Sequence, residues 1–463
     1  MISLFILGGV CGKAKPADPL LKISIKNATE ILVHAEMPQP VREVSFRNIY
    51  AGAFNLGDRI HNFEAGTVAD KTLPLQKVTV GEYRTDIPAQ SFTYQVSVPS
   101  PRAGDVAHVT WLSGEYGCLM LADLLPSLFD KTEVHIELTL PTGWSAEFAG
   151  TTDSDGRFLV RHPEDAVFFV GRNLRRKTDV VHGQRLNVAI GGRWKISDRA
   201  ILESARKVFE HYLIGIDYKL SDSPLIIIAP FSFEGNSSWK AQTRGANVVV
   251  AIDPAAQLGN WKSQLGVIFT HELLHLWVPN SLALRGDYDW FFEGFTLYEA
   301  LLTALHLKLI DFREYLDTLA RVYDSYLSYP NDMSLIEASE RRWTSTSPLV
   351  YDKGMLVAFI YDLMVRTQSD GRTTLSDLYR ELFHSPTTKS NDANEAIINL
   401  LNGSLSNKAF SKEYIESREL LDLTVTQKSG IVFDSSRTKT KVTINQDLSD
   451  TQLKILKSLG YRR

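Results

Sequence analysis

The hydrophobic pattern of the first third of the chain is that of β-strands. In residues 134–140 apolar side chains alternate with polar ones, the two-residue period of a strand with one buried face. Short runs of similar character at residues 22–25, 94–98 and 108–112 are separated by Pro, Gly and Asn, and no long helical pattern intervenes. The pattern predicts an antiparallel β-sandwich over residues 20–152.

The pattern changes after the polar stretch at residues 151–156. Residues 198–213 carry apolar side chains at helical spacing, and a Ser–Asp pair stands where it can cap the N-terminus of this helix. Continuous apolar runs at residues 225–228 and 247–252 indicate buried or edge strands. From Trp261 onward helical patterns dominate.

Strands followed by helices predict an α+β protein, and 463 residues are too many for one compact core. We expect a β-sandwich domain at residues 20–152, a mainly helical domain with a small sheet at residues 153–404, and a short C-terminal extension at residues 405–463. Residues 1–19 are expected to be an export signal or a disordered start.

The composition of the chain excludes several kinds of binding site and stabilising device. The formal charge of −4 and the pI near 6.3 provide no basic field for nucleic acid or for an anionic membrane. The chain has only two cysteines, Cys11 and Cys118, which excludes a disulfide framework and a cysteine-ligated metal site.

The chain begins with an apolar run, residues 1–12, that is too short to span a bilayer. It resembles the hydrophobic part of a secretion signal, although no Lys or Arg precedes it. We therefore expect an exported protein of the periplasm or cell envelope. A lipid anchor through Cys11 is the less favoured alternative, because Gly8 stands where Leu is usual, and a misassigned start remains a further one.

Candidate chemistry centres on His271-Glu-Leu-Leu-His275. Residues four apart on a helix share a face, so the two imidazoles can bind one metal ion, while Glu272 beside them can reach a metal-bound water. Glu293 opens another apolar-periodic helix 18 positions after His275 and supplies a third ligand. Catalytic zinc takes three protein ligands and keeps one open position, so His271, His275 and Glu293 predict a site for one Zn²⁺ ion. The alternative is two ordinary histidines on a helix.

Residues 265–366 resemble gluzincin metallopeptidases, specifically the glycyl aminopeptidase family, which is related to the alanyl aminopeptidases. The resemblance is carried by His271-Glu272-x-x-His275-x-Trp277, Glu293-Gly-Phe-Thr-x-Tyr298, Ser334-Leu-x-Glu-Ala-Ser339 and Tyr351-x-Lys353-Gly354. It implies a thermolysin-like catalytic domain in which Glu272 is the general base. It also implies that the Tyr351 hydroxyl donates to the oxyanion of the tetrahedral intermediate.

Two departures from that family affect the expected specificity. The family carries a Glu that binds the free α-amine of the substrate, whereas the corresponding stretch here, residues 239–247, has no acidic residue. Glu234 is a candidate substitute, and a turn residue is its plainer interpretation. The roughly 60 residues after Leu405 are also too few for the PDZ domain that commonly ends the family's chains.

We therefore expect a zinc-dependent peptidase, an aminopeptidase acting on short peptides, with residues 247–252 as the strand along which an extended peptide pairs. One alternative is a gluzincin endopeptidase that does not recognise a free amine. The other is a peptide-binding protein on a peptidase scaffold that has lost hydrolysis, although the intact His, Glu and Tyr set argues against it. The expected partner is a peptide substrate.

Overall fold

The computed structural model describes residues 18–67, 71–100, 104–233, 238–255, 261–330, 332–342, 346–384, 392–406, 408–436 and 438–462. The expected export signal and the candidate lipid anchor at Cys11 lie outside these residues, and so does Glu234. Within these ranges, no helix is both long enough and apolar enough to cross a membrane.

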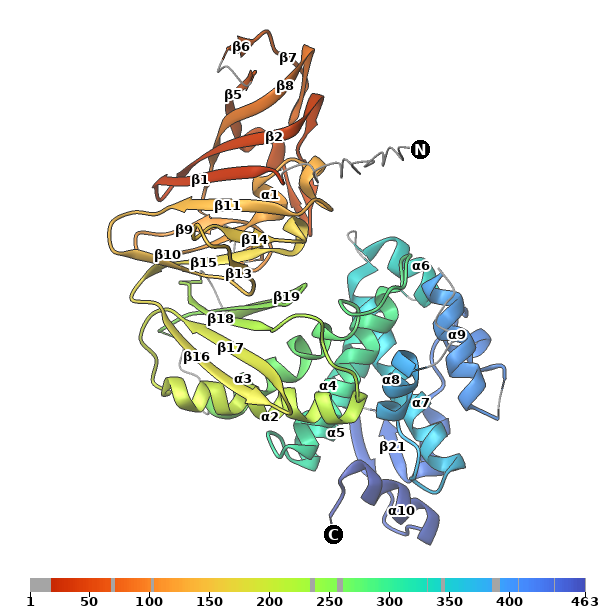
Figure 1. The fold of residues 1–463 in the computed structure, drawn as a ribbon. Helices are drawn as coiled ribbons and strands as arrows, with labels where there is room; N and C mark the ends of the chain where they lie inside the picture. The colour runs from red at the N-terminus through yellow and green to blue at the C-terminus, as the bar shows by residue number, and fades with distance from the viewer. Residues whose placement is uncertain are drawn as a thin grey trace, which may run out of the picture.

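The N-terminal half contains two sheets packed face to face (Figure 1). The larger sheet has the strand order β13-β14-β11-β1-β2-β8-β5-β6, with β7 also paired to β8. Its strands are β1 (Leu20–Asn27), β2 (Glu30–Ser45), β5 (Ile60–Gly66), β6 (Thr72–Leu73), β7 (Gln76–Thr79), β8 (Glu82–Ser97), β11 (Val134–Thr139), β13 (Thr151–Thr152) and β14 (Phe158–Val160).

The second sheet has the order β12-β15-β10-β9 and forms the middle layer of the molecule. Its strands are β9 (Trp111–Leu112), β10 (Tyr116–Met120), β12 (Trp144–Glu147) and β15 (Val167–Arg172). Side chains of β15 alternate as a strand buried on both faces requires: Phe168 and Val170 face the first sheet, and Val167 and Phe169 face the third.

The predicted sandwich is present, with two details that differ from the expectation. The pair β1–β11 runs parallel, whereas the expected sandwich was antiparallel. Strands β14 and β15 pair within the N-terminal sheets, so the third sheet begins only at Arg175, later in the chain than the expected boundary at residue 152. The polar stretch at residues 151–156 is a hairpin within the first sheet, because β13 pairs with β14.

The third sheet has the order β16-β17-β18-β20-β19 and lies between the sandwich and the helices. Its strands are β16 (Arg175–Val181), β17 (Gln184–Ile190), β18 (Leu225–Pro230), β19 (Trp239–Arg244) and β20 (Asn247–Ile252). Its helix-facing side packs against α2 (Asp198–Ile216) and α3 (Trp261–Glu272). Ser197 caps α2, accepting from the backbone N–H of Ala200 at 3.2 Å, as the sequence predicts.

Helices dominate after Trp261, as the hydrophobic pattern predicts. It contains η5 (Trp290–Phe295) continuing into α4 (Thr296–His306), α5 (Phe312–Leu327), α6 (Leu335–Glu340), η7 (Leu349–Lys353) continuing into α7 (Gly354–Gln368), α8 (Leu375–His384) and α9 (Ala393–Ser404). The remaining short elements are β3 (Ile49–Tyr50), β4 (Ala53–Phe54), η1 (Leu56–Arg59), α1 (Leu121–Leu124), η2 (Ser127–Phe129), η3 (Pro163–Asp165), η4 (Leu274–Leu276), η9 (Ser411–Ile415) and η10 (Leu423–Ser429). Strands first and helices after confirm the α+β class.

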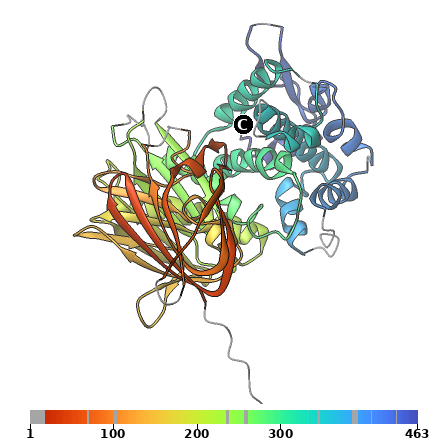
Figure 2. The same cartoon turned by 90° about the horizontal axis from the view of Figure 1, so that it is seen from above.

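The segment after residue 405 packs into the helical core. A hairpin of β21 (Ile431–Asp434) and β22 (Lys441–Ile444) lies against α5, and α10 (Asp450–Leu459) covers α7. Ile431, Ile455 and Leu456 are fully buried in the same hydrophobic core as α7. Viewed from above, the sandwich and the helical part lie side by side (Figure 2).

Two glycines set the approach of the helices that carry the candidate residues. Gly294 in η5 and Gly354 at the start of α7 meet backbone to backbone: a Cβ on Gly294 would lie 2.5 Å from the Cα of Gly354. Only residues without side chains allow this spacing. The glycines of the Glu-Gly and Lys-Gly motifs therefore bring η5 and the start of α7 into contact.

Candidate metal centre

The two histidines of the motif lie at the end of α3. Regular α-helix ends at Glu272, and a tighter 3₁₀ turn, η4, carries His275. The two side chains converge across this change of helix type: the Nε2 atoms of His271 and His275 are 3.1 Å apart. His275 is buried and His271 is half-buried.

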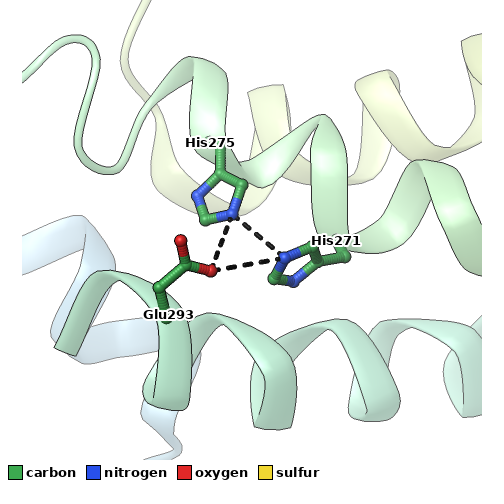
Figure 3. Close-up of side chains that lie close together, drawn as sticks. All are labelled: His271, His275 and Glu293. Carbon is green, nitrogen blue, oxygen red and sulfur yellow. Dashed lines mark hydrogen bonds and ion pairs between the residues drawn. The ribbon is translucent and has the colours of Figure 1, made fainter. Parts of the chain in front are cut away.

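Glu293 brings the third candidate ligand from η5 (Figure 3). Its Oε2 lies 3.6 Å from Nε2 of His271 and 3.5 Å from Nε2 of His275. Tetrahedral zinc with bonds of about 2.0–2.1 Å separates its ligand atoms by roughly 3.3 Å. The three observed separations therefore fit one zinc ion, and the nitrogen and oxygen donor set suits zinc as well.

Hydrogen bonding orients His275 for such a role. Its Nδ1 lies 2.9 Å from the carbonyl oxygen of Val278 and donates to it, which leaves the Nε2 lone pair facing His271 and Glu293. Burial lowers the pKa of His275, but the Glu293 carboxylate outweighs that effect, so the pKa is raised above 6.5. The surroundings of His275 therefore stabilise positive charge, as a site for a metal ion must.

A guanidinium group completes the surroundings of Glu293. Arg342 donates through Nη2 to Oε1 of Glu293 at 2.6 Å and to the hydroxyl of Tyr351 at 2.8 Å, and through Nη1 to Asp289. Burial would raise the pKa of Glu293, but His275, His271 and Arg342 together hold it well below its usual value. Glu293 is therefore ionised, as a metal ligand must be.

Glu272 lies beside the histidines and is held by the third sheet. The hydroxyl of Thr243, on β19, lies 2.8 Å from Oε2 of Glu272 and 2.7 Å from its carbonyl oxygen. The carboxylate is close enough to His275 to contribute to the raised pKa of that imidazole. It is 6% exposed, so little bulk water competes for it.

Tyr351 reaches the same place from η7. Its hydroxyl accepts from Arg342, and burial together with the nearby Glu293 carboxylate raises its pKa well above 10. The hydroxyl therefore stays protonated at neutral pH and can donate its proton to an oxyanion.

The N-terminal sandwich also contributes to this region. The side chain of Gln242 on β19 lies within hydrogen-bonding reach of the His108 imidazole. Burial and the cations Arg244, Arg342 and Lys240 lower the pKa of His108 to about 4, so the imidazole is neutral. Residues 239–247, which contain no acidic side chain, thus contribute the amide of Gln242 and the cationic side chains of Lys240 and Arg244.

The structure brings together His271, Glu272, His275, Glu293 and Tyr351. Two further polar residues of the same helical segments have other contacts. Asn280 donates to the carbonyl of Gly245 at 3.0 Å, tying the end of the zinc-motif segment to the β19–β20 turn. Glu299 is buried, with Ser376 donating to it at 2.6 Å, and burial raises its pKa to about 7.

Sequence reasoning missed Arg342, Thr243 and Asp289. Asp289 and Glu293 are four apart, so two acids share one face of a buried helix, and such a pair requires a nearby cation. That spacing is a signal that could have directed attention to a basic partner. Nothing in the local pattern singles out Arg342 among the arginines or Thr243 in a strand.

Comparisons with known proteins identify the fold. No family model matches the chain. A segment of 84 residues, 18% of this chain, is 31% identical to a puromycin-sensitive aminopeptidase of Caenorhabditis elegans, and it spans only 9% of that protein.

Solved structures match over most of the chain. An aminopeptidase N family protein of Idiomarina loihiensis superposes with a TM-score of 0.77, 19% identity and coverage of 90% of this chain and 79% of that one. An M1 zinc metallopeptidase of Deinococcus radiodurans gives a TM-score of 0.55 at 12% identity, over 88% of this chain and 94% of that one. A mutant of the Deinococcus protein bound to a Tyr-Ser-Ala substrate gives 0.55 at 14% identity over the same shares. The chain therefore has the fold of M1 zinc metallopeptidases, and the narrower resemblance to glycyl aminopeptidases stays a prediction.

Proposed function

We propose that the protein is a zinc-dependent peptidase, with His271, His275 and Glu293 as the ligands of one zinc ion. One observation carries the proposal: three ligand atoms from two separate segments converge with the spacing of a tetrahedral metal site. When bound, zinc polarises the scissile carbonyl and lowers the pKa of a water molecule to about 7.

Glu272 is proposed as the general base. It follows His271 directly, lies close to His275, and is restrained by Thr243. From there its carboxylate accepts a proton from the attacking water and passes it to the leaving amine. The Thr243 hydroxyl limits the positions that the carboxylate can adopt and so keeps it oriented for this transfer.

Tyr351 is proposed as the donor to the oxyanion that forms during hydrolysis. Its hydroxyl is protonated and accepts from the guanidinium that also contacts Glu293, which supports this role. A donor fixed beforehand stabilises the developing charge without reorganisation.

Strand β19 provides a place for the substrate backbone. It pairs with β20 on one side and is the last strand of its sheet in the described part of the chain, and its Thr243 contacts the proposed base. An extended peptide can pair with this free edge, which brings a peptide bond to the metal centre. The neighbouring edge strand β19, rather than the expected β20, is therefore the proposed docking strand.

We favour an aminopeptidase acting on short peptides, supported by the aminopeptidases among the similar proteins and by the tripeptide bound to the Deinococcus enzyme. An endopeptidase is the second candidate. It is favoured by Lys240 and Arg244 on β19, where the resemblance calls for an acidic group that binds a free amine.

The test pairs metal analysis with cleavage mapping. Purified protein is stripped with a chelator, reloaded with zinc, and given matched peptides with free and acetylated N-termini. We expect activity only in the zinc-loaded sample, with one residue released from the free peptides. Equal cleavage of both peptides would identify an endopeptidase. A zinc-loaded protein that binds peptides and cleaves none would show a peptide-binding protein instead.

A further inference from the structure

Arg342 touches two of the residues that the proposed function employs. A single nitrogen, Nη2, lies 2.6 Å from Oε1 of Glu293 and 2.8 Å from the hydroxyl of Tyr351. The guanidinium is 14% exposed and packs over the rings of Phe292 and Tyr351, with its central carbon 5.5 Å and 5.6 Å from their centroids. Its position is thus defined from several sides.

The contact with Glu293 decides which carboxylate oxygen faces the metal centre. Oε1 accepts from Arg342, whereas Oε2 lies within 3.6 Å of both imidazole Nε2 atoms. A carboxylate fixed through one oxygen presents the other in a single orientation, which favours a ligand that binds through one atom. Loss of Arg342 would free the carboxylate to rotate.

The contact with Tyr351 determines what its hydroxyl can do. Arg342 has no acceptor, so the Tyr351 oxygen accepts from it and the hydroxyl keeps its own proton, for which the Glu293 carboxylate is one acceptor within reach. A hydroxyl that accepts from a cation is a stronger donor in its turn. The same guanidinium therefore both locates and polarises this hydroxyl.

Asp289 anchors the guanidinium at its other end. It accepts from Nη1, and it precedes Glu293 by one helical turn, so both carboxylates face the same cation. The fork shape of arginine is needed for this: one nitrogen meets Asp289 while the other meets Glu293 and Tyr351. A lysine could supply the charge and not the geometry.

We propose that Arg342 is a positioning residue that couples the metal ligand Glu293 to the oxyanion donor Tyr351. This rests on the proposed peptidase function for its effect on turnover. Its effect on metal binding stands on the His271, His275 and Glu293 geometry alone, so the two ideas can fail separately.

The experiment compares Arg342→Gln, Arg342→Lys and wild type, with Arg341→Lys as the control because Arg341 is exposed and next in sequence. Zinc affinity is measured by competition with a chromophoric chelator, and kcat and KM are measured on a short peptide. We expect Arg342→Gln to lose zinc affinity and kcat, each by roughly 10- to 100-fold, with KM changed less than about threefold. Arg342→Lys should recover only part of each loss.

A double-mutant cycle with Tyr351→Phe tests the coupling itself. If Arg342 acts through that hydroxyl, the combined loss in kcat is smaller than the product of the single losses. Asp289→Asn is the second variant, since it loosens the anchor without touching a ligand; we expect smaller losses in the same direction. Unchanged zinc affinity and kcat in both Arg342 variants, or full recovery in Arg342→Lys, would overturn the proposal. If wild type binds zinc and cleaves no peptide, the function fails while the affinity measurements still decide the role of Arg342.

Discussion

The hydroxyl of Thr243 lies 2.8 Å from the Glu272 carboxylate and 2.7 Å from the carbonyl of the same residue, which links the edge strand β19 to the end of helix α3. The strand along which a peptide is proposed to lie is thereby attached to the proposed base. A shift of one would be transmitted to the other.

Thr243→Val tests this link with little change in shape. Valine keeps the volume of threonine and removes the hydroxyl, so Glu272 loses its restraint. We expect kcat to fall about tenfold, ~1.4 kcal/mol of transition-state stabilisation, with zinc content unchanged. Steady-state kinetics with metal analysis of the same sample provides the measurement. Wild-type kcat in this variant would mean that the contact has no role in turnover.

Glu272→Gln separates catalysis from metal binding. The amide keeps the size of the side chain and can still accept from Thr243, but it cannot take up a proton at neutral pH. We expect full zinc content and a loss of kcat of roughly 10²- to 10⁴-fold. Activity near wild type would exclude Glu272 as the base.

Tyr351→Phe should affect turnover more than binding. The hydroxyl is needed only when negative charge develops on the substrate, so its removal costs about 3 kcal/mol in the transition state and lowers kcat on the order of 100-fold. KM should change little. A rise in KM at constant kcat would instead show that Tyr351 binds the substrate in its ground state.

Gly294→Ala should disturb the site without altering any functional group. The added methyl would meet the backbone of Gly354 at 2.5 Å, forcing η5 and α7 apart. We expect about 1–3 kcal/mol of lost stability by thermal unfolding and weaker zinc binding, because Glu293 moves away from the histidines. Gly403→Ala is the matched control, since open space surrounds that glycine. Equal stability and zinc affinity in both variants would contradict the role given to the close contact between Gly294 and Gly354.

Glu299→Gln should change how stability depends on pH. The folded pKa of Glu299 is raised from 4.5 to about 7 by burial, so the folded state binds more protons than the unfolded state between these values. Stability from this group is therefore fully present below pH 4.5 and falls as pH rises to about 7, by about 3 kcal/mol. Denaturant unfolding at pH 5 and pH 8 should show a smaller decrease for the variant than for wild type.

The sequence predicts much of this molecule because its signals are local. Helix α2 and strand β20 follow directly from the apolar pattern, and residue type predicted a cap at Ser197 or Asp198, of which the structure shows Ser197. His271, Glu272, His275 and Glu293 were predicted from a spacing that reflects metal chemistry, whereas the role of Tyr351 was implied by the resemblance to gluzincin peptidases. Their convergence was an inference, since His275 and Glu293 belong to different helices.

What the sequence could not predict depends on contacts across long separations. Strand β15 completes a sheet with β10, so no local change in composition marks where the sandwich ends. Arg342 reaches Glu293 from 49 residues away, and Thr243 reaches Glu272 from a strand 29 residues earlier. Such contacts depend on how the sheets and helices pack, and the type of a single residue does not predict that packing.

The packing of the C-terminal segment limits how short a working protein can be made. Lys353, two residues after Tyr351, donates to the carbonyl of Ser417 at 3.1 Å, and Ile431 and Leu456 fill the core beside α7. A truncation at residue 404 would leave an apolar face of α7 open to solvent and remove a carbonyl partner of a buried ammonium group. Any minimal version for engineering has to retain the hairpin and the last helix, even though none of their described residues belongs to the proposed metal site.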